Sequence, residues 1–238
     1  MALLVRDALV NGALYLAYQP IVDVRTGAIY GQEGLVRSHA AELPAPRDII
    51  PAAVEQNFMG SLGRALRAMA VRDCPGTNLF LNIHPDEFNE GWLVRPDDPI
   101  FAHDELVYME ITESVPLSHY RFCHSVLREL RSRGAKLAVD DLGAGYSNLK
   151  YIADLEPEIV KLDRELVAGL RIGSRQHTLV RSIVSMCEAQ EARVVAEGIE
   201  TADELRAVID AGVHYVQGFF LARPAFPAPR SEWDPRRF

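Results

Sequence analysis

The chain has 238 residues, of which 48% are hydrophobic and 24% charged, a composition typical of a globular protein. Its formal net charge of −8 argues against non-specific binding to nucleic acid. No apolar run approaches the roughly 20 residues that a membrane span needs, and the opening Met1–Arg6 is too short for a signal peptide. The three cysteines are odd in number and widely spaced, which favours the reduced thiols of a cytoplasmic protein over a disulfide or zinc framework.

Strand-like segments recur along the chain, with helical patterns between most of them. The first two, residues 15–23 and 28–36, are joined by a turn sequence that includes Gly27, so we expect an antiparallel hairpin. The stretch over residues 48–73 is long enough for two helices. The other predicted strands cover residues 78–83, 106–111, 136–140, 159–162, 193–196 and 215–220.

Three further helices are predicted between the later strands. Residues 118–133 carry apolar side chains at the spacing of one helix face and are followed by Gly134, and residues 176–190 repeat the pattern. Residues 201–204 form a capping box that opens a helix ending at Gly212. Alternation of strands and helices predicts parallel strands with right-handed crossovers. Eight strands favour a closed (β/α)₈ barrel, although an open, doubly wound sheet also fits the periodicity.

The length of the chain predicts one domain. A barrel of alternating strands and helices typically takes about 250 residues as a single domain. Residues 224–238 contain four prolines and show no apolar period, so we expect an extended flap or a linker there. The predicted division is a domain over residues 1–223 and a Pro-rich tail over residues 224–238.

Polar residues lie at or near the ends of seven predicted strands. In chain order they are Glu33, Asn82, Glu110, Asp140 with Asp141, Lys161, Glu197 and Gln217. In a barrel these ends meet at one rim, where catalytic groups lie. A polar residue at one strand end is usually a solvated turn, but seven in succession are poorly explained that way. Converged carboxylates repel one another unless cations hold them, and an all-oxygen set suits Mg²⁺ or Mn²⁺ rather than zinc.

Two of these positions carry more specific signals. Adjacent strand residues point to opposite faces, so Asp140 and Asp141 can serve one site only where the strand ends or bends. Standing alone, this pair before the glycine-rich residues 142–146 would indicate an ordinary turn. Lys161 is one of three lysines and lies in an apolar strand. Among carboxylates its ammonium could orient an attacking hydroxide, whereas alone it would indicate a snorkelling side chain at the barrel mouth.

In these motifs the sequence resembles the EAL-domain cyclic di-GMP phosphodiesterases, from Tyr18 to Pro224. The matching segments are residues 18–21, 33–37, 81–83, 110–114, 140–147, 161–164, 196–201 and 217–220. The resemblance implies a (β/α)₈ barrel of the TIM type whose first strand runs antiparallel to the rest. It also implies hydrolysis of cyclic di-GMP to linear pGpG, which lowers the level of this second messenger in bacterial signalling.

The resemblance implies two divalent metal ions, Mg²⁺ or Mn²⁺. The ligands that it implies for one ion are Glu33, Asn82, Glu110 and Asp140. Those for the other are Asp140, Asp141 and Glu197. A hydroxide between the ions would attack one phosphodiester in line, while the metals stabilise the attacking and leaving oxygens. Because Ca²⁺ is larger and polarises water less, we expect it to inhibit.

Further residues take supporting roles by the same resemblance. Lys161 would contact the nucleophilic water, and Glu113 would anchor the loop over residues 141–148. Glu200 and Gln217 would support the metals and the water. The residues that it implies for substrate binding are Gln19, Leu35, Arg37, Asp163 and Arg164.

The sequence departs from the family pattern at four positions. Gly34 replaces the alanine of the signature, which loosens the strand that carries Glu33 by roughly 0.5–1 kcal/mol. Leu142 and Ala144 replace the Phe and Thr that are common in the loop over residues 141–148. Ser38 stands where an aromatic residue often follows the arginine. All the implied metal ligands are present.

Two other function classes fit parts of the pattern. A cyclic di-GMP receptor with little or no turnover would use the same pocket to signal to a partner, but the retained ligands favour an enzyme. A magnesium-dependent lyase or isomerase would leave Asn82, Gln19 and Arg37 unexplained. The resemblance further implies a homodimer and, in a longer parent protein, a fused sensory or GGDEF module.

Overall fold

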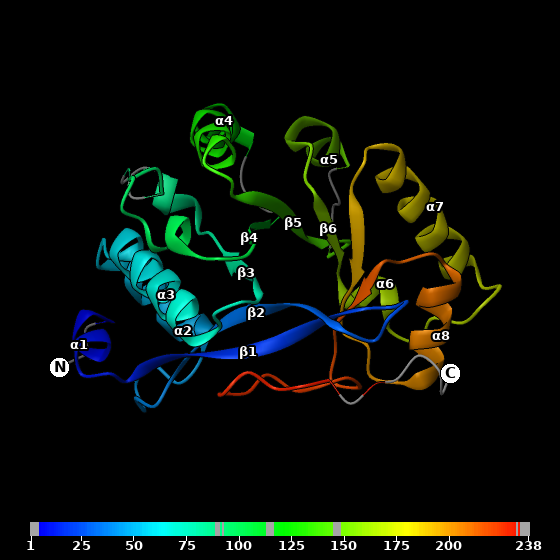
Figure 1. The fold of residues 1–238 in the computed structure, drawn as a ribbon, viewed down its shortest axis with the longest axis horizontal. Coiled ribbons are helices and arrows are strands. Elements are labelled where there is room, and N and C mark those ends of the chain that lie inside the picture. The colour runs from blue at the N-terminus through cyan, green and yellow to red at the C-terminus, as the bar shows by residue number, and fades with distance from the viewer. Residues whose placement is uncertain are drawn as a thin grey trace.

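The structure is a computed structural model that describes residues 5–88, 91, 93–112, 117–144, 149–231 and 233. Over these residues, eight strands close into a barrel in chain order, with helices around the outside (Figure 1). The strands are β1 Leu14–Asp23, β2 Ile29–Ser38, β3 Asn78–Asn82, β4 Val107–Thr112, β5 Lys136–Leu142, β6 Ile159–Leu162, β7 Arg193–Ala196 and β8 Tyr215–Val216. The closed barrel confirms the predicted fold class and excludes the open sheet.

The strand β1 runs antiparallel to both of its neighbours, β2 and β8, and all other neighbours are parallel. The turn between β1 and β2 is held by Asp23, whose Oδ1 accepts hydrogen bonds from the backbone N–H groups of Arg25 and Thr26 at 2.8 and 3.0 Å. Gly27 completes this turn at φ 72°, a conformation that favours glycine. The predicted hairpin is therefore confirmed.

Each helical stretch that was predicted with bounds is confirmed, and the structure adds the short helices Val5–Val10, Lys150–Leu155 and Arg164–Val167. They are α1 Val5–Val10, α2 Pro46–Glu55, α3 Met59–Asp73, α4 Leu117–Ser132, α5 Lys150–Leu155, α6 Arg164–Val167, α7 Arg175–Ala189 and α8 Ala202–Asp210, with short 3₁₀ helices η1 Pro85–Phe88 and η2 Pro99–Ala102. The stretch over residues 48–73 splits into α2 and α3 near Asn57, which takes φ 48°. The capping box of α8 forms between Thr201 and Glu204. None of the helices in the described part of the chain has the length and hydropathy that a membrane-spanning segment requires.

The prediction was wrong about the length of the last strand. It extended to residue 220, but β8 ends at Val216. Beyond that point the chain pairs with the loop after β7, because Ile199 N–H donates to the Gln217 carbonyl at 3.1 Å and Phe220 N–H donates to the Ile199 carbonyl at 2.9 Å. Gly218 permits this approach, since a Cβ there would lie 2.2 Å from the Ile199 carbonyl oxygen.

The described part of the C-terminal tail lies along β1 (Figure 1). Because β8 pairs with only Val22 and Asp23 of β1, most of that edge of β1 is available to another segment. Tyr18 and Ala225 exchange two backbone hydrogen bonds there, at 2.8 and 3.0 Å. The tail is thus extended, while the domain boundary at residue 223 stays a prediction.

Apolar side chains fill both sides of the barrel wall. One large cluster packs β1–β5 against α2, α3 and α4, and another packs β6–β8 against α7 and α8. A third cluster is aromatic in part and plugs the barrel interior, where Phe80 stacks on Tyr108 at 4.4 Å and Tyr30 on Tyr215 at 4.1 Å between ring centroids. This plug forms the floor beneath the polar residues of the rim.

Candidate active site

The polar rim follows from the two-residue period of the strands. Side chains two positions apart point to the same face of a strand, so a plug residue is followed by an inward residue one layer higher. The plug residues of the parallel strands β3–β8 are Phe80, Tyr108, Ala138, Ile159, Val195 and Tyr215. Two positions after each come Asn82, Glu110, Asp140, Lys161, Glu197 and Gln217. The sequence therefore builds an apolar floor and a charged layer directly above it.

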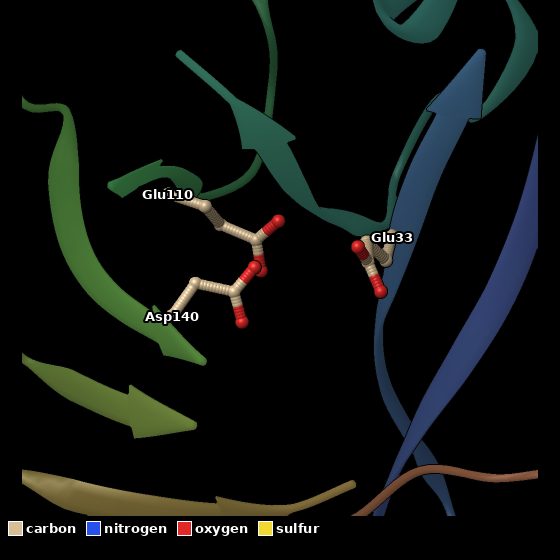
Figure 2. Close-up of side chains that lie close together, drawn as sticks. All are labelled: Glu33, Glu110 and Asp140. Carbon is tan, nitrogen blue, oxygen red and sulfur yellow. The ribbon is translucent and has the colours of Figure 1, made fainter. Parts of the chain in front are cut away.

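Lys161 lies at the centre of this charged layer, with only 1% of its surface exposed. Its Nζ lies 2.7 Å from Oε1 of Glu110 and 2.7 Å from Oε1 of Glu197. Asp140 and Glu33 are farther, at 3.1 and 3.6 Å. Figure 2 shows the carboxylates of Glu33, Glu110 and Asp140 turning toward one space from three separate strands. The sequence prediction that these strand ends converge is borne out geometrically.

Burial shapes the electrostatics of this layer. It raises the pKa of Glu110 and of Glu197 well above the ordinary value, against the lowering effect of Lys161. Burial, helped by the neighbouring Asp140, raises the pKa of Asp141 to about 6. Burial alone would lower the pKa of Lys161, but the surrounding carboxylates hold it well above its usual range. One ammonium among so many carboxylates leaves an excess of negative charge that further cations would relieve.

The carboxylates fall into two groups that fit divalent cations. In the first, one oxygen each of Glu33, Glu110 and Asp140 lie within 4.8 Å of one another, and in the second those of Asp140, Asp141 and Glu197 do. Asp140 belongs to both groups. Carboxylate oxygens suit hard cations such as Mg²⁺ and Mn²⁺. The donor set therefore fits two such ions that share Asp140.

The backbone bends where both aspartates must reach the site. Asp141 takes φ 58°, in the left-handed region, and the pairing of β5 with β6 shifts register between Val139 and Leu142. Aspartate tolerates this conformation better than most residues. The bend turns Asp141 toward the same side as Asp140, which the alternation of a regular strand would forbid.

Asn82 joins the first carboxylate group through its amide. Its Nδ2 donates to Oε2 of Glu110 at 3.1 Å and to Oε1 of Glu33 at 3.5 Å. Rotation of the amide by 180° would exchange nitrogen and oxygen and present Oδ1, the atom that can ligate a metal, to the same space. Unlike the buried Glu33, Glu110 and Asp140, Asn82 is exposed.

A pocket of about 260 Å³ opens beside the carboxylates. Gln19 lies in its wall, where it accepts from Gln217 Nε2 at 3.2 Å and donates through Nε2 to the Ala222 carbonyl at 3.1 Å. Gln217 Nε2 also donates to Oε2 of Glu33 at 2.5 Å, which links the wall to the first carboxylate group. The other lining residues that the sequence had singled out are Leu35, Asp140, Asp141, Lys161, Asp163, Arg164, Glu197 and Glu200.

Some predicted site residues take other positions or cannot be placed. Arg37 is not among the residues that line this pocket, and its Nη1 donates to the Val36 carbonyl at 2.8 Å. Asp163 does line the pocket, and one of its oxygens also caps α6 by accepting from Glu165 N–H at 2.7 Å. Glu113 lies outside the described residues, as do residues 145–148 of the loop that it was expected to anchor.

The structure also places residues at the pocket that sequence reasoning assigned no role. Phe219 lines it, and the guanidinium of Arg223 lies over its ring at 4.3 Å. Gly198 lines it at φ 68°, and a Cβ there would lie 2.6 Å from Cβ of Arg164, whose Nη2 pairs with Oε1 of Glu200 at 3.0 Å. In the sequence, Phe219 directly follows Gln217-Gly218, and this position could have predicted its place at the pocket.

Comparison with known proteins gives consistent matches. PdeI of Escherichia coli, a probable cyclic di-GMP phosphodiesterase, is 30% identical over 97% of this chain and 31% of its own length. A cyclic di-GMP phosphodiesterase of Pseudomonas aeruginosa is 29% identical over 92% of this chain and 40% of its own. Klebsiella pneumoniae BlrP1, solved with manganese and cyclic di-GMP, superposes with a TM-score of 0.78 at 30% identity, over 90% of this chain and 56% of that one.

These curated relatives are much longer than the present chain, which spans less than half of the length of each. The model of the EAL domain family matches residues 4–224, nearly the whole sequence. That match includes every strand of the barrel and each residue of the charged layer. The chain therefore belongs to the EAL domain family.

Proposed function

We propose that this domain is a phosphodiesterase that hydrolyses cyclic di-GMP to linear pGpG with two divalent cations, Mg²⁺ or Mn²⁺. The observation that carries the proposal is the pair of carboxylate groups that share Asp140 beside Lys161. The names of two relatives as cyclic di-GMP phosphodiesterases, and the manganese and cyclic di-GMP complex of BlrP1, support the substrate and the kind of metal.

The ligands of one ion would be Glu33, Asn82, Glu110 and Asp140. Those of the other would be Asp140, Asp141 and Glu197. Two such ions supply activation of water and neutralisation of the charge on the phosphodiester. The protein holds these ligands rigidly, because most of them project from barrel strands above the packed floor.

Lys161 would steady the attacking water, because its ammonium is fixed by carboxylates on both sides. The water oxygen adds to phosphorus and the bond from phosphorus to the 3′ oxygen breaks. One proton of the water is lost, and the leaving 3′ oxygen takes up a proton to become a hydroxyl. The product therefore keeps a 5′ phosphate, as in pGpG.

The pocket wall would hold the rest of the substrate. Gln19 has its amide oriented by Gln217 and Ala222, which prepares it to hydrogen-bond a guanine edge. Arg164 and Glu200 stand at the rim as an ion pair that can meet polar groups of the nucleotide. Leu35 and Phe219 offer apolar surface to a base. Arg37 would have to swing from Val36 to reach a phosphate.

The direct test is to incubate the protein with cyclic di-GMP and Mg²⁺, Mn²⁺, Ca²⁺ or excess chelator, and to resolve the products by chromatography. We expect pGpG with Mg²⁺ or Mn²⁺, and neither Ca²⁺ nor the chelator should support turnover. Equal turnover in chelator would overturn the metal mechanism. Tight binding of cyclic di-GMP without any pGpG would assign the domain as a receptor instead.

We also propose a homodimer that pairs through the face next to residues 141–148, in a cytoplasmic protein that carries a sensory or GGDEF module beside this domain. The greater length of the relatives supports further modules, and the free, buried thiols of Cys74 and Cys187 support a reducing compartment. Sedimentation at micromolar concentration tests the dimer, and a fully active monomer would contradict it.

A further inference from the structure

A buried charged cluster ties the helix α3 to the segment that follows β3. Its members are Arg67, Glu87 and Asp98, each at most 2% exposed, and we call it the Arg67 cluster. Nη1 of Arg67 lies 2.6 Å from Oε2 of Glu87, and Nη2 lies 3.0 Å from Oδ2 of Asp98. Nε of Arg67 donates to the same carboxylate of Asp98 at 3.1 Å. The cluster thus fixes the Glu87 carboxylate from the helix side.

Two residues of α3, Arg67 and Gly63, make room for this cluster and balance its charge. Burying an arginine is costly unless its charge is paired, so Arg67 needs both carboxylates. Gly63, one turn earlier on α3, allows Glu87 to approach, since a Cβ there would lie 2.0 Å from Oε2 of Glu87. Glycine weakens a helix interior, yet it stands here where the carboxylate meets the helix.

The second carboxylate oxygen of Glu87 contacts the backbone two residues after Asn82. Oε1 accepts a hydrogen bond from the backbone N–H of His84 at 3.0 Å. The residue before it, Ile83, donates its N–H to the Glu110 carbonyl at 2.9 Å. The backbone immediately after Asn82 is therefore held on one side by the strand β4 and on the other by Glu87.

Asn82 needs this backbone support more than the other ligands do. Glu33, Glu110 and Asp140 are buried, so packing and neighbouring side chains hold them. Asn82 is exposed at the end of β3, so its hydrogen bonds to Glu110 and Glu33 and the position of its backbone hold it, rather than packing. Placement within about 0.5 Å is needed for an effective ligand, so the path of residues 83 and 84 decides where its amide lies.

We propose that Glu87, oriented by Arg67 and Asp98, is a positioning residue that holds Asn82 in place as a metal ligand. The inference rests on the proposed two-metal function, since it assigns Glu87 a role toward that site. Groups that orient metal ligands typically affect metal affinity about 10- to 100-fold when removed. Glu87 acts through the backbone of His84 and touches neither metal nor substrate.

The test is a double-mutant cycle read out as Mn²⁺ affinity of the metal-free protein, measured by calorimetry, with thermal stability recorded for every variant. We expect Glu87→Ala to weaken Mn²⁺ binding about 10-fold. We expect the double variant Asn82→Ala/Glu87→Ala to bind Mn²⁺ no more weakly than Asn82→Ala alone, because the effect of Glu87 passes through Asn82. Glu87→Gln keeps one acceptor oxygen, which can serve either His84 N–H or Arg67 but not both, so its Mn²⁺ affinity should lie between those of Glu87→Ala and the wild type.

Arg72→Met is the matched control. Arg72 lies on the same helix, is exposed and pairs with Asp73 at 2.7 Å, and neither residue belongs to the Arg67 cluster. It should leave Mn²⁺ affinity unchanged. If Glu87→Ala does not fold, Gly63→Ala replaces it, since the added Cβ displaces the Glu87 carboxylate and should weaken Mn²⁺ binding to a similar extent.

The outcomes separate the two proposals. A folded Glu87→Ala variant with wild-type Mn²⁺ affinity overturns the positioning role, and so do losses that add in the double variant. Likewise, wild-type affinity in a folded Gly63→Ala variant would contradict it. If instead Asn82→Ala itself leaves Mn²⁺ affinity unchanged, Asn82 is no ligand and the metal assignment of the proposed function fails at that residue.

Discussion

Nζ of Lys161 lies 2.7 Å from Oε1 of Glu110, whose side chain is fully buried and which also accepts from Asn82 through its other oxygen. The ammonium therefore compensates the charge of the least hydrated carboxylate in the barrel. Two roles of Lys161 can be measured separately. Its ion pairs hold the carboxylates of the charged layer together, and in the proposed mechanism it steadies the attacking water.

Lys161→Met should lower kcat by about 100-fold or more, because a fixed charge at the reacting centre is lost. In the metal-free protein it should also lower the thermal midpoint, since the carboxylates then repel without compensation. Mn²⁺ should raise that midpoint more in the variant than in the wild type. Lys136→Met is the control, because Lys136 pairs with Glu158 at 3.5 Å on the surface. An unchanged kcat would remove Lys161 from the mechanism.

Asp141→Ala should abolish nearly all turnover while cyclic di-GMP still binds. The group of Glu33, Glu110 and Asp140 stays intact, but the second group loses one of its three carboxylates. Loss of several kcal/mol of barrier lowering corresponds to more than about 100-fold in rate. Turnover measured with Mn²⁺ and binding measured by calorimetry check both parts. Asp203→Ala on the surface of α8 is the control, and retention of a tenth of the activity by Asp141→Ala would contradict the second ion.

The two described free cysteines should be unreactive in the folded protein. Burial raises the pKa of Cys74 to about 11 and that of Cys187 to about 12. At pH 8 less than about one thiol in a thousand is then ionised, against about a quarter for a free cysteine, and the thiolate is the reactive form. Reactivity should therefore rise with pH only well above 9.

Cys123→Ser provides the background for this measurement, because the side chain of Cys123 lies outside the described part of the structure. Titration with a thiol reagent at pH 8 should show no rapid phase in the folded protein and two thiols after denaturation. A rapid phase of one or two thiols before denaturation would show that the site around Cys74 or Cys187 opens readily.

Much of the site was predictable because it is encoded locally. Phe80 and Asn82, or Tyr108 and Glu110, are two positions apart, so the alternation of a strand places an apolar floor residue and a polar rim residue on one face. Once eight strands close, every such pair converges. The bend at Asp141 could also be predicted from the sequence, since two adjacent aspartates can share a site only where the strand departs from regular geometry.

The remaining features depend on contacts between distant segments. Arg67 meets Glu87 and Asp98 only because α3 packs on the segments after β3, and no spacing in the sequence joins the three. The early end of β8 depends on the backbone of Ile199, which competes for the hydrogen bonds of residues 217–220. Local β propensity was outweighed there by a tertiary contact.

Two glycines on β2 face opposite sides of the barrel wall, and alanine should affect them differently. Gly34, the departure from the family signature, faces the helices. A Cβ there would lie 3.0 Å from Cδ2 of Leu81 and 3.5 Å from Cδ1 of Leu16. Both leucines border a cavity of about 330 Å³ between the strands and α2 and α3, so the Leu81 methyl group has room to move. The chain thus has space for the missing methyl group.

Gly34→Ala should therefore raise the free energy of unfolding by up to about 1 kcal/mol, because glycine weakens a strand interior. Turnover should change less than about two-fold, since Glu33 is already fixed by Gln217 and the buried layer. A rise in turnover from near zero would show that Gly34 silences the domain as a receptor. A large fall in turnover would show that the Leu81 methyl group cannot move aside.

Gly31→Ala is the contrasting variant on the same strand. Gly31 faces the barrel floor, where a Cβ would lie 2.8 Å from Cε2 of Phe80 and 2.9 Å from the backbone oxygen of Asn78. The Phe80 ring, which stacks on Tyr108, and the backbone of β3 cannot move aside as easily as the single methyl group of Leu81. Overpacking of this kind typically costs about 1–3 kcal/mol, so denaturant unfolding should show Gly31→Ala less stable and Gly34→Ala unchanged or more stable. Equal destabilisation of both variants would contradict the assignment of the two faces.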